Sequence, residues 1–312
     1  MIIYKILFLA FAVSISCAEL VAYAQDGATK NIFDKFSGAG FKLTRASSGS
    51  DKGEPADFGF LTDIGKQTEF HANFFISYRP SSTSWGTTEV TPSASIEGKL
   101  SSSDSSAKDA WRFRLGSQFD VPIGGGIQVQ DPTGLPISVT VNKNHLWLSL
   151  DAKYESDRDF RTKKASAEFR ISPTLPYLFI GDQPPHDSKG PEQPIRFQWR
   201  PIFETDFGHT FDPGDSTEVN NTILRLITRI QANLFLNFLK KPLGMQDVSI
   251  YADNVFFYLP IENQKTTHNY LVTGINFMIS KNVGLNFEYK NGEDSPNFVR
   301  THTVGGSLSI TF

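Results

Sequence analysis

The sequence predicts an all-β fold, a transmembrane antiparallel up-and-down β-barrel of about 12 strands, within a range of 10 to 14. Three observations support this prediction. Apolar and polar side chains alternate strictly in many segments, as they do in strands with one apolar face. Most of these segments run about nine to thirteen residues, the length that a tilted strand needs to cross the hydrocarbon layer, whereas strands in soluble proteins have about five or six. After residue 24, no stretch reaches the ~18 apolar residues of a membrane helix.

The N-terminus has the features of a secretory signal peptide over residues 1–24. Lys5 precedes an apolar run over 6–16, and Ala22-Tyr23-Ala24 forms an A-x-A cleavage site. A retained anchor is the weaker alternative because the run is too short to span a bilayer. Lipidation of Cys17 is also a minor alternative. Since Cys17 is the one cysteine of the chain, we expect no disulfide, zinc–thiolate site or cysteine nucleophile in the mature protein.

Residues 25–54 form a polar N-terminal extension that precedes the predicted barrel domain, residues 55–312. The extension is rich in Gly, Ser and Lys, which is typical of flexible segments. Two interpretations stay open. The extension is either a periplasmic tail or a plug that folds into the barrel.

The clearest predicted strand covers residues 111–121. Trp111, Phe113 and Leu115 fall on one face, and Arg112 and Arg114 fall on the other. The two faces require opposite solvents. The same alternation recurs in residues 70–78, 146–154, 165–171, 195–200, 224–236, 248–252, 271–279, 283–289 and 302–312, and more weakly in residues 56–61 and 90–100.

Polar segments rich in Gly, Asp, Asn and Ser separate these strands and predict loops. The expected loops are residues 101–106, 155–162, 208–221 and 291–297. Two longer interruptions, 122–144 and 173–194, each have room for one further strand, which would raise the number to fourteen. The glycines at 124–126 predict a bulge or turn, because a phosphate-binding loop would need a lysine and a following helix.

The last residues resemble the C-terminal strand of Gram-negative outer-membrane proteins. Val304, Leu308, Ile310 and Phe312 alternate with small polar residues, and the chain ends on the phenylalanine. Ile310 departs from the aromatic residue often found third from the end in that superfamily. The resemblance assigns no specific family, but it implies a location in the cell outer membrane and contact with its lipid. It also implies recognition of Leu308, Ile310 and Phe312 by the barrel-assembly machinery.

An even number of strands would place both ends of the barrel chain on the periplasmic side. The two long interruptions would then also lie on that side, where turns should be short. A soluble β-sandwich would show similar alternation, so the membrane prediction depends on strand length and on the C-terminal resemblance.

Composition and motifs argue against several functions. A net charge of −3 does not favour nucleic acid as a partner. The six histidines lack metal-site spacing, and neither H-E-x-x-H nor G-x-S-x-G occurs, so we expect no metal, no cofactor and no enzyme. The sets that could build an outer-membrane lipase or protease are His209 with Asp212 and Asp215, and His268 with Asp253, but many chains of this composition contain such pairs.

The leading functional hypothesis is a channel for small polar solutes, with anions as one class of solute, because the inferred lumen positions are charged. Two arginine pairs, Arg112 with Arg114 and Arg225 with Arg229, could form a basic stripe that selects anions. An internal salt-bridge network that closes a narrow barrel is the alternative to this stripe, and the sequence favours neither over the other. A non-conducting structural or adhesion barrel and an outer-membrane hydrolase are the second and third hypotheses, and the oligomeric state stays open. The pore-lining candidates are Glu97, Arg112, Arg114, Asp120, Asp151, Lys153, Glu168, Arg170, Arg196, Arg200, Glu204, Arg225, Arg229 and Glu288.

Overall fold

The computed structural model describes most of the barrel region of the chain. The predicted signal peptide, residues 1–24, and the terminal Phe312 lie outside the described residues, as do the glycines at 124–126. The described residues are 41–44, 56–63, 68–79, 82–101, 110–123, 127–130, 136–139, 144–175, 178–181, 193–212, 221–261, 266–280, 282–294 and 298–310.

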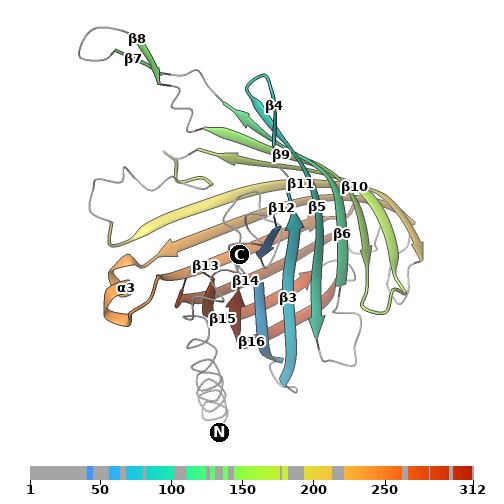
Figure 1. Cartoon of the computed structure of the whole chain (residues 1–312). Coiled ribbons are helices and arrows are strands. Elements are labelled where there is room, and N and C mark those ends of the chain that lie inside the picture. The colour runs from blue at the N-terminus through green and yellow to red at the C-terminus, as the bar shows by residue number, and fades with distance from the viewer. Residues whose placement is uncertain are drawn as a thin grey trace.

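Among the described residues, twelve antiparallel strands close a barrel, which confirms the predicted fold class (Figure 1). Closure comes from the pairing of β16 with β2 and of β3 with β5. Each of the twelve predicted segments falls on one of these strands. The strands follow one another around the barrel as β2 (Ala56–Asp63), β3 (Thr68–Tyr78), β5 (Thr88–Ser101), β6 (Ala110–Pro122), β9 (His145–Ser156), β10 (Lys163–Thr174), β11 (Arg196–Asp212), β12 (Thr222–Phe235), β13 (Asp247–Tyr258), β14 (Thr267–Met278), β15 (Val283–Asp294) and β16 (Val299–Ile310).

Part of the predicted N-terminal extension joins the barrel wall. β1 (Phe41–Thr44) pairs with residues 75–78 of β3, and β2 pairs with residues 68–73 of the same strand. β1 and β2 therefore share one edge of β3, one after the other. At the next hairpin, the short strand β4 (Thr83–Trp85) pairs with the beginning of β5.

The long connections lie at the end of the barrel where β2 begins and β16 ends, which we call the terminal end; the opposite end is the far end. Between β6 and β9, β7 (Ile127–Gln130) and β8 (Pro136–Val139) form a separate two-stranded sheet away from the barrel (Figure 1). Between β10 and β11, Ile180 forms isolated β-bridges with Leu175 and Trp199. Neither described connection adds a barrel strand, so the number stays at twelve. Helix α3 (Asn237–Leu243) joins β12 to β13 at the same end.

All four predicted loops begin too early. The difference is small at 101–106, where β5 ends at Ser101, and at 155–162, where β9 ends at Ser156. β11 continues to Asp212 and β15 to Asp294, so the loop predictions for 208–221 and 291–297 are wrong at these boundaries. Gly208 and His209 stay in register with β10 and β12. Backbone groups make the ladder hydrogen bonds, so polar side chains and glycine do not by themselves end a strand. Within the described residues, no helix is long and apolar enough to span a membrane.

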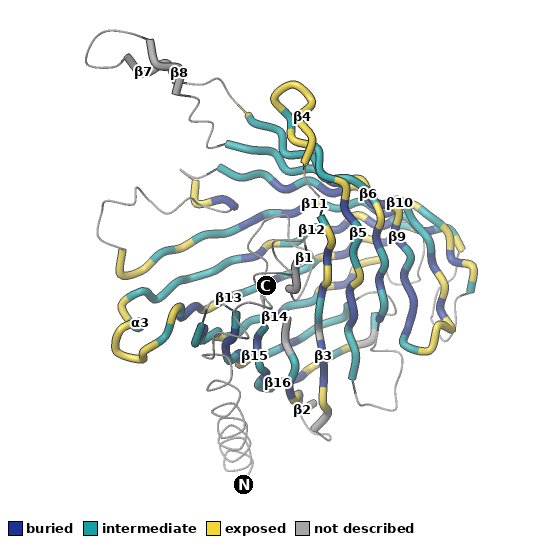
Figure 2. Tube along the Cα trace, in the orientation of Figure 1, coloured by how far each residue is buried: buried dark blue, intermediate teal, exposed yellow. Residues whose placement is uncertain are grey.

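The polarity of the barrel is inverted relative to a soluble protein. Large apolar side chains lie on the outside, where Leu115 is 68% and Phe207 64% exposed, whereas Glu168 and Asp206 inside are fully buried. Buried and exposed residues alternate along the strands in Figure 2. Charged residues are rarely buried in soluble proteins, and a closed barrel leaves no sheet edge unpaired in lipid. The chain is a membrane-spanning barrel of the outer-membrane type.

Candidate functional site

The fourteen residues predicted to line the lumen all occupy inward positions of their strands. Arg112 and Arg114 of β6 are buried and alternate with the outward Trp111, Phe113 and Leu115. Asp120 lies nearer the terminal end and approaches His145 Nδ1 at 2.7 Å. The placement follows from strand parity, and a role in solute passage is a proposal taken up below. Besides these, the inward positions carry Asp151, Lys153, Glu168, Arg170, Arg196, Arg200, Glu204, Arg225, Arg229, Glu97 and Glu288.

Eight of the buried inward side chains form a closed ring of ion pairs in the far half of the lumen. Four cations alternate with four carboxylates, so no like charges are adjacent along the ring. The ring reaches from β5 to β12. Its pairs are Glu97–Arg112 (2.6 Å), Arg112–Glu155 (2.8 Å), Glu155–Arg225 (2.7 Å), Arg225–Asp206 (4.0 Å), Asp206–Lys153, Lys153–Glu168 (3.0 Å), Glu168–Arg114 (3.1 Å) and Arg114–Glu97 (3.0 Å).

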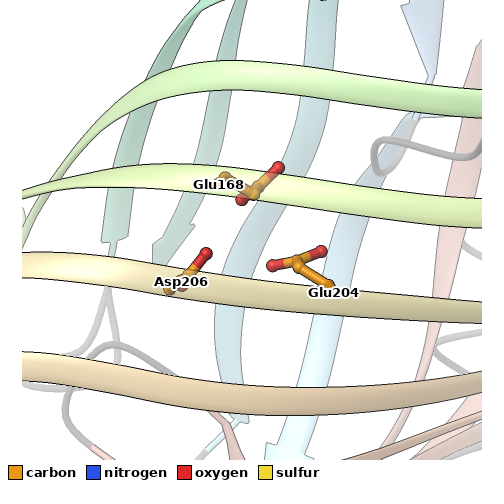
Figure 3. Close-up of side chains that lie close together, drawn as sticks. All are labelled: Glu168, Glu204 and Asp206. Atoms are coloured by element: carbon orange, nitrogen blue, oxygen red, sulfur yellow. The ribbon is translucent and has the colours of Figure 1, made fainter.

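Two carboxylates of this ring, Glu168 of β10 and Asp206 of β11, lie close to a third carboxylate, Glu204 of β11. Figure 3 shows Glu168, Glu204 and Asp206 pointing toward one another, with oxygens close enough to hold a metal ion. The ammonium of Lys153 already lies among them, 3.0 Å from Glu168 and 3.8 Å from Glu204, and it also contacts Asp206. Arg170 adds a second cation beside Glu168 and Glu204. Because cationic side chains supply the compensating charge, this cluster is not assigned as a metal site.

Other pairs cross the lumen between strands that are not neighbours. Lys99 of β5 contacts Asp294 of β15 and lies 5.9 Å from the ring centroid of Tyr270. His71 of β3 lies 3.5 Å from Glu288 of β15. These two pairs reduce the open cross-section of the lumen, because each joins side chains from two separate parts of the barrel wall.

An apolar cluster occupies the far end of the lumen beside the ring member Arg225. Ile227, Phe257 and Leu259 are buried there, with Phe298 packed against them. Phe298 has φ of 53°, a left-handed conformation that bulky residues rarely adopt. Its ring stacks on His268 at 4.1 Å and meets Phe257 edge-on at 5.2 Å. The guanidinium of Arg225 lies 5.7 Å from the same ring. Phe298 therefore joins the apolar cluster to the ion-pair ring at this mouth.

Between these two regions lies a cavity of about 110 Å³. A single water needs about 10–15 Å³ on this measure, so the cavity can hold several waters. Its described lining includes seven cations, four carboxylates and six apolar or aromatic residues. They are Lys99, Arg112, Arg114, Lys153, Arg170, Arg229 and Lys290; Glu97, Glu204, Asp253 and Asp294; and Ile202, Ile227, Val255, Phe257, Tyr270 and Val272.

Several residues of the ion-pair ring and of the cavity lining were not among the predicted site residues. Glu155 was assigned to a loop, and Asp206 lay beyond the predicted end of its strand. Continuing the alternation by a few residues would have found both. Ile202, Ile227 and Phe257 had no signal in their own polarity, because alternation assigns an apolar residue to the outer face. Their parity with inward charged residues of the same strands could have found them.

The two predicted hydrolase sets are not assembled in the described residues. His209 is exposed at an outward position and packs edge-on against Phe211, and Asp215 lies outside the described residues. His268 Nδ1 lies 2.6 Å from Glu293, while Asp253 pairs with Arg229.

Comparisons with known proteins give only distant structural likenesses. No protein-family model matches the chain, and no curated protein sequence does. The NanC porin matches with a TM-score of 0.41 and 6% identity over 82% of this chain and 98% of its own. The KdgM porin matches with a TM-score of 0.35 and 9% identity over the same shares. The transport unit of the Escherichia coli autotransporter AIDA-I gives 0.37 and 9% over 87% and 89%. With all three TM-scores below 0.5, these likenesses add nothing to the account of the site.

Proposed function

We propose that the chain forms a narrow channel that passes small polar solutes across the outer membrane. The observation that carries this proposal is the charged cavity inside a closed barrel with an apolar exterior. Buried ion pairs are weak contributors to stability, and apolar residues of similar volume can replace them without loss. A barrel that only needed a filled interior could use such residues. The interior of this barrel has charged side chains instead, which favours a path for polar solutes.

The lining of the cavity favours anions. Seven cations face it against four carboxylates, while four further carboxylates, Glu155, Glu168, Asp206 and Glu288, pair with some of these cations but are not part of the lining. The arginines are not a free basic stripe, because Arg112 and Arg114 both bind Glu97. The side chains that face the cavity nevertheless include more cationic N–H donors than carboxylates, and such donors bind anions.

The closed ion-pair ring is the specific observation that favours a second candidate, a non-conducting structural barrel. In that case the ring and the cluster around Phe298 would be permanent fillers of the interior. The two candidates differ in one measurable property, the passage of ions.

Conductance across a planar bilayer tests the proposal. Folded protein, verified by its altered gel migration before boiling, should give stepwise currents in KCl with a reversal potential that favours chloride. Arg229→Gln, at the cavity, should shift the chloride-to-potassium permeability ratio toward unity, because it removes a lining cation. Arg300→Gln, an exposed residue at an outward position of β16, is the matched control. Folded protein that never opens, either as wild type or as Phe298→Ala, would overturn the proposal.

A further inference from the structure

The cavity has two chemically different sides. On one side, inward residues of β5, β6, β9 and β10 form what we call the charged wall, represented by Glu97, Arg112, Arg114 and Arg170. On the other side is what we call the apolar wall. It is a group of six side chains, Ile202, Ile227, Val255, Phe257, Tyr270 and Val272, which come from β11 to β14. Glu204, Arg229 and Asp253 line the cavity from the same strands.

The contacts of Glu97 show how the charged wall binds a carboxylate. The two oxygens of Glu97 lie 2.6 Å from Arg112 and 3.0 Å from Arg114, with Lys99 at 3.9 Å. Arginine suits carboxylates because its planar group of N–H donors matches their geometry. The same wall adds Arg170, and Arg229 and Lys290 face the cavity from other strands. A single free carboxylate is therefore a chemically suitable partner for this side.

The apolar wall has no evident use in a passage for simple ions. The interiors of channel barrels are polar, and apolar side chains in contact with water are unfavourable. Ile227 and Phe257 also pack against Phe298, but Ile202 and Val272 are buried inward residues that line the cavity and lie outside that cluster. An apolar portion of a solute would cover this wall.

The volume of the cavity limits the size of the apolar portion of the solute. A cavity of about 150 Å³ lined by apolar residues accepts one benzene molecule. The cavity here is smaller, at about 110 Å³. An aliphatic body of about three to five carbons is therefore the appropriate size.

We infer that the cavity is a binding site for a small monocarboxylate with an apolar body, its carboxylate on the charged wall and its hydrocarbon on the apolar wall. The inference rests on the proposed channel, since it names the class of solute that would use it.

Calorimetric titration of the folded protein in detergent tests this site, with butyrate, acetate and 4-hydroxybutyrate as probes. Butyrate should bind at least about tenfold more tightly than acetate, because it buries two additional methylenes and each contributes roughly fourfold. It should also bind more tightly than 4-hydroxybutyrate, which has a similar length and a polar end.

Val272→Thr should remove the advantage of butyrate, since a hydroxyl replaces a methyl group of the apolar wall. Val304→Thr, at an exposed outward position of β16, is the matched control and should keep it. Equal affinity for butyrate and 4-hydroxybutyrate, or an unchanged preference in Val272→Thr, would overturn the site.

Conductance of the same preparation separates the two proposals. Binding of butyrate without any conductance would leave the site standing and overturn the channel. Chloride conductance without selective binding would leave the channel standing and overturn the site. Absence of both would overturn both.

Discussion

The charged wall and the apolar wall enclose the same cavity but are stabilised in opposite ways. On the charged wall, each ring member has two oppositely charged neighbours, as Glu97 has in Arg112 and Arg114. On the apolar wall, Ile227 and Phe257 depend on packing with Phe298. The first wall is held by many mutually dependent ion pairs, and the second by removal of apolar surface from water. The difference teaches that a membrane barrel need not be uniformly polar inside.

Removing the cation at the centre of the charged wall should have the largest effect on stability. Lys153→Ala leaves Glu168, Glu204 and Asp206 with less compensating charge, and loss of one partner of a buried pair costs about 3–5 kcal/mol. Urea unfolding in detergent measures this loss. Ca²⁺ should restore part of it in the variant, because three carboxylate oxygens would then be open to a hard cation. A variant as stable as wild type, or wild type stabilised equally by Ca²⁺, would contradict the account of the cluster.

A positive charge on the outer face should have the next largest effect. Leu115 lies beside the inward Arg114 but faces lipid, so Leu115→Arg should cost about 2–4 kcal/mol of unfolding free energy in lipid vesicles. Trp85→Arg is the control, because Trp85 is 78% exposed on β4, which pairs with β5 outside the set of twelve barrel strands. Similar losses in the two variants would argue against a lipid-facing surface at Leu115.

Opening the apolar cluster should change conductance more than stability. Phe298→Ala removes the ring that joins this cluster to Arg225 at the far end, so the unitary current should increase. Phe160→Ala is a matched control, because Phe160 also has a positive φ, of 56°, but lies exposed in the connection between β9 and β10. Single-channel recording compares the two. An equal current in Phe298→Ala and wild type would show that this ring does not narrow the path.

The sequence predicted the strands and their faces well because both depend on local alternation. Arg112 between Trp111 and Phe113 assigns the inner face of β6 without knowledge of any other strand. The partners across the lumen could not be predicted. Glu155 and Arg225 are 70 residues apart and meet only because β9 and β12 have a particular stagger around the barrel.

The apolar wall was missed for a physical reason. Ile202 and Ile227 are at inward positions, yet their side chains are indistinguishable in sequence from lipid-facing residues. Only their parity with charged residues of the same strand, Arg200 and Glu204 for Ile202 and Arg225 and Arg229 for Ile227, shows that they face inward. Alternation identifies a face by its polarity, so it fails where a lumen contains apolar residues.

Accessibility of single cysteines during conductance recording tests the central claim most directly, namely that solutes pass between the two walls. The chain contains one cysteine, Cys17, so a new thiol gives a clear signal against the unsubstituted protein as control. Val272→Cys lies at the cavity, and Ile275→Cys lies on the outer face of the same strand. An anionic, membrane-impermeant thiol reagent should reduce the current through Val272→Cys and leave Ile275→Cys unchanged. Channels of Val272→Cys that the reagent does not affect, or equal inhibition of both variants, would contradict the account.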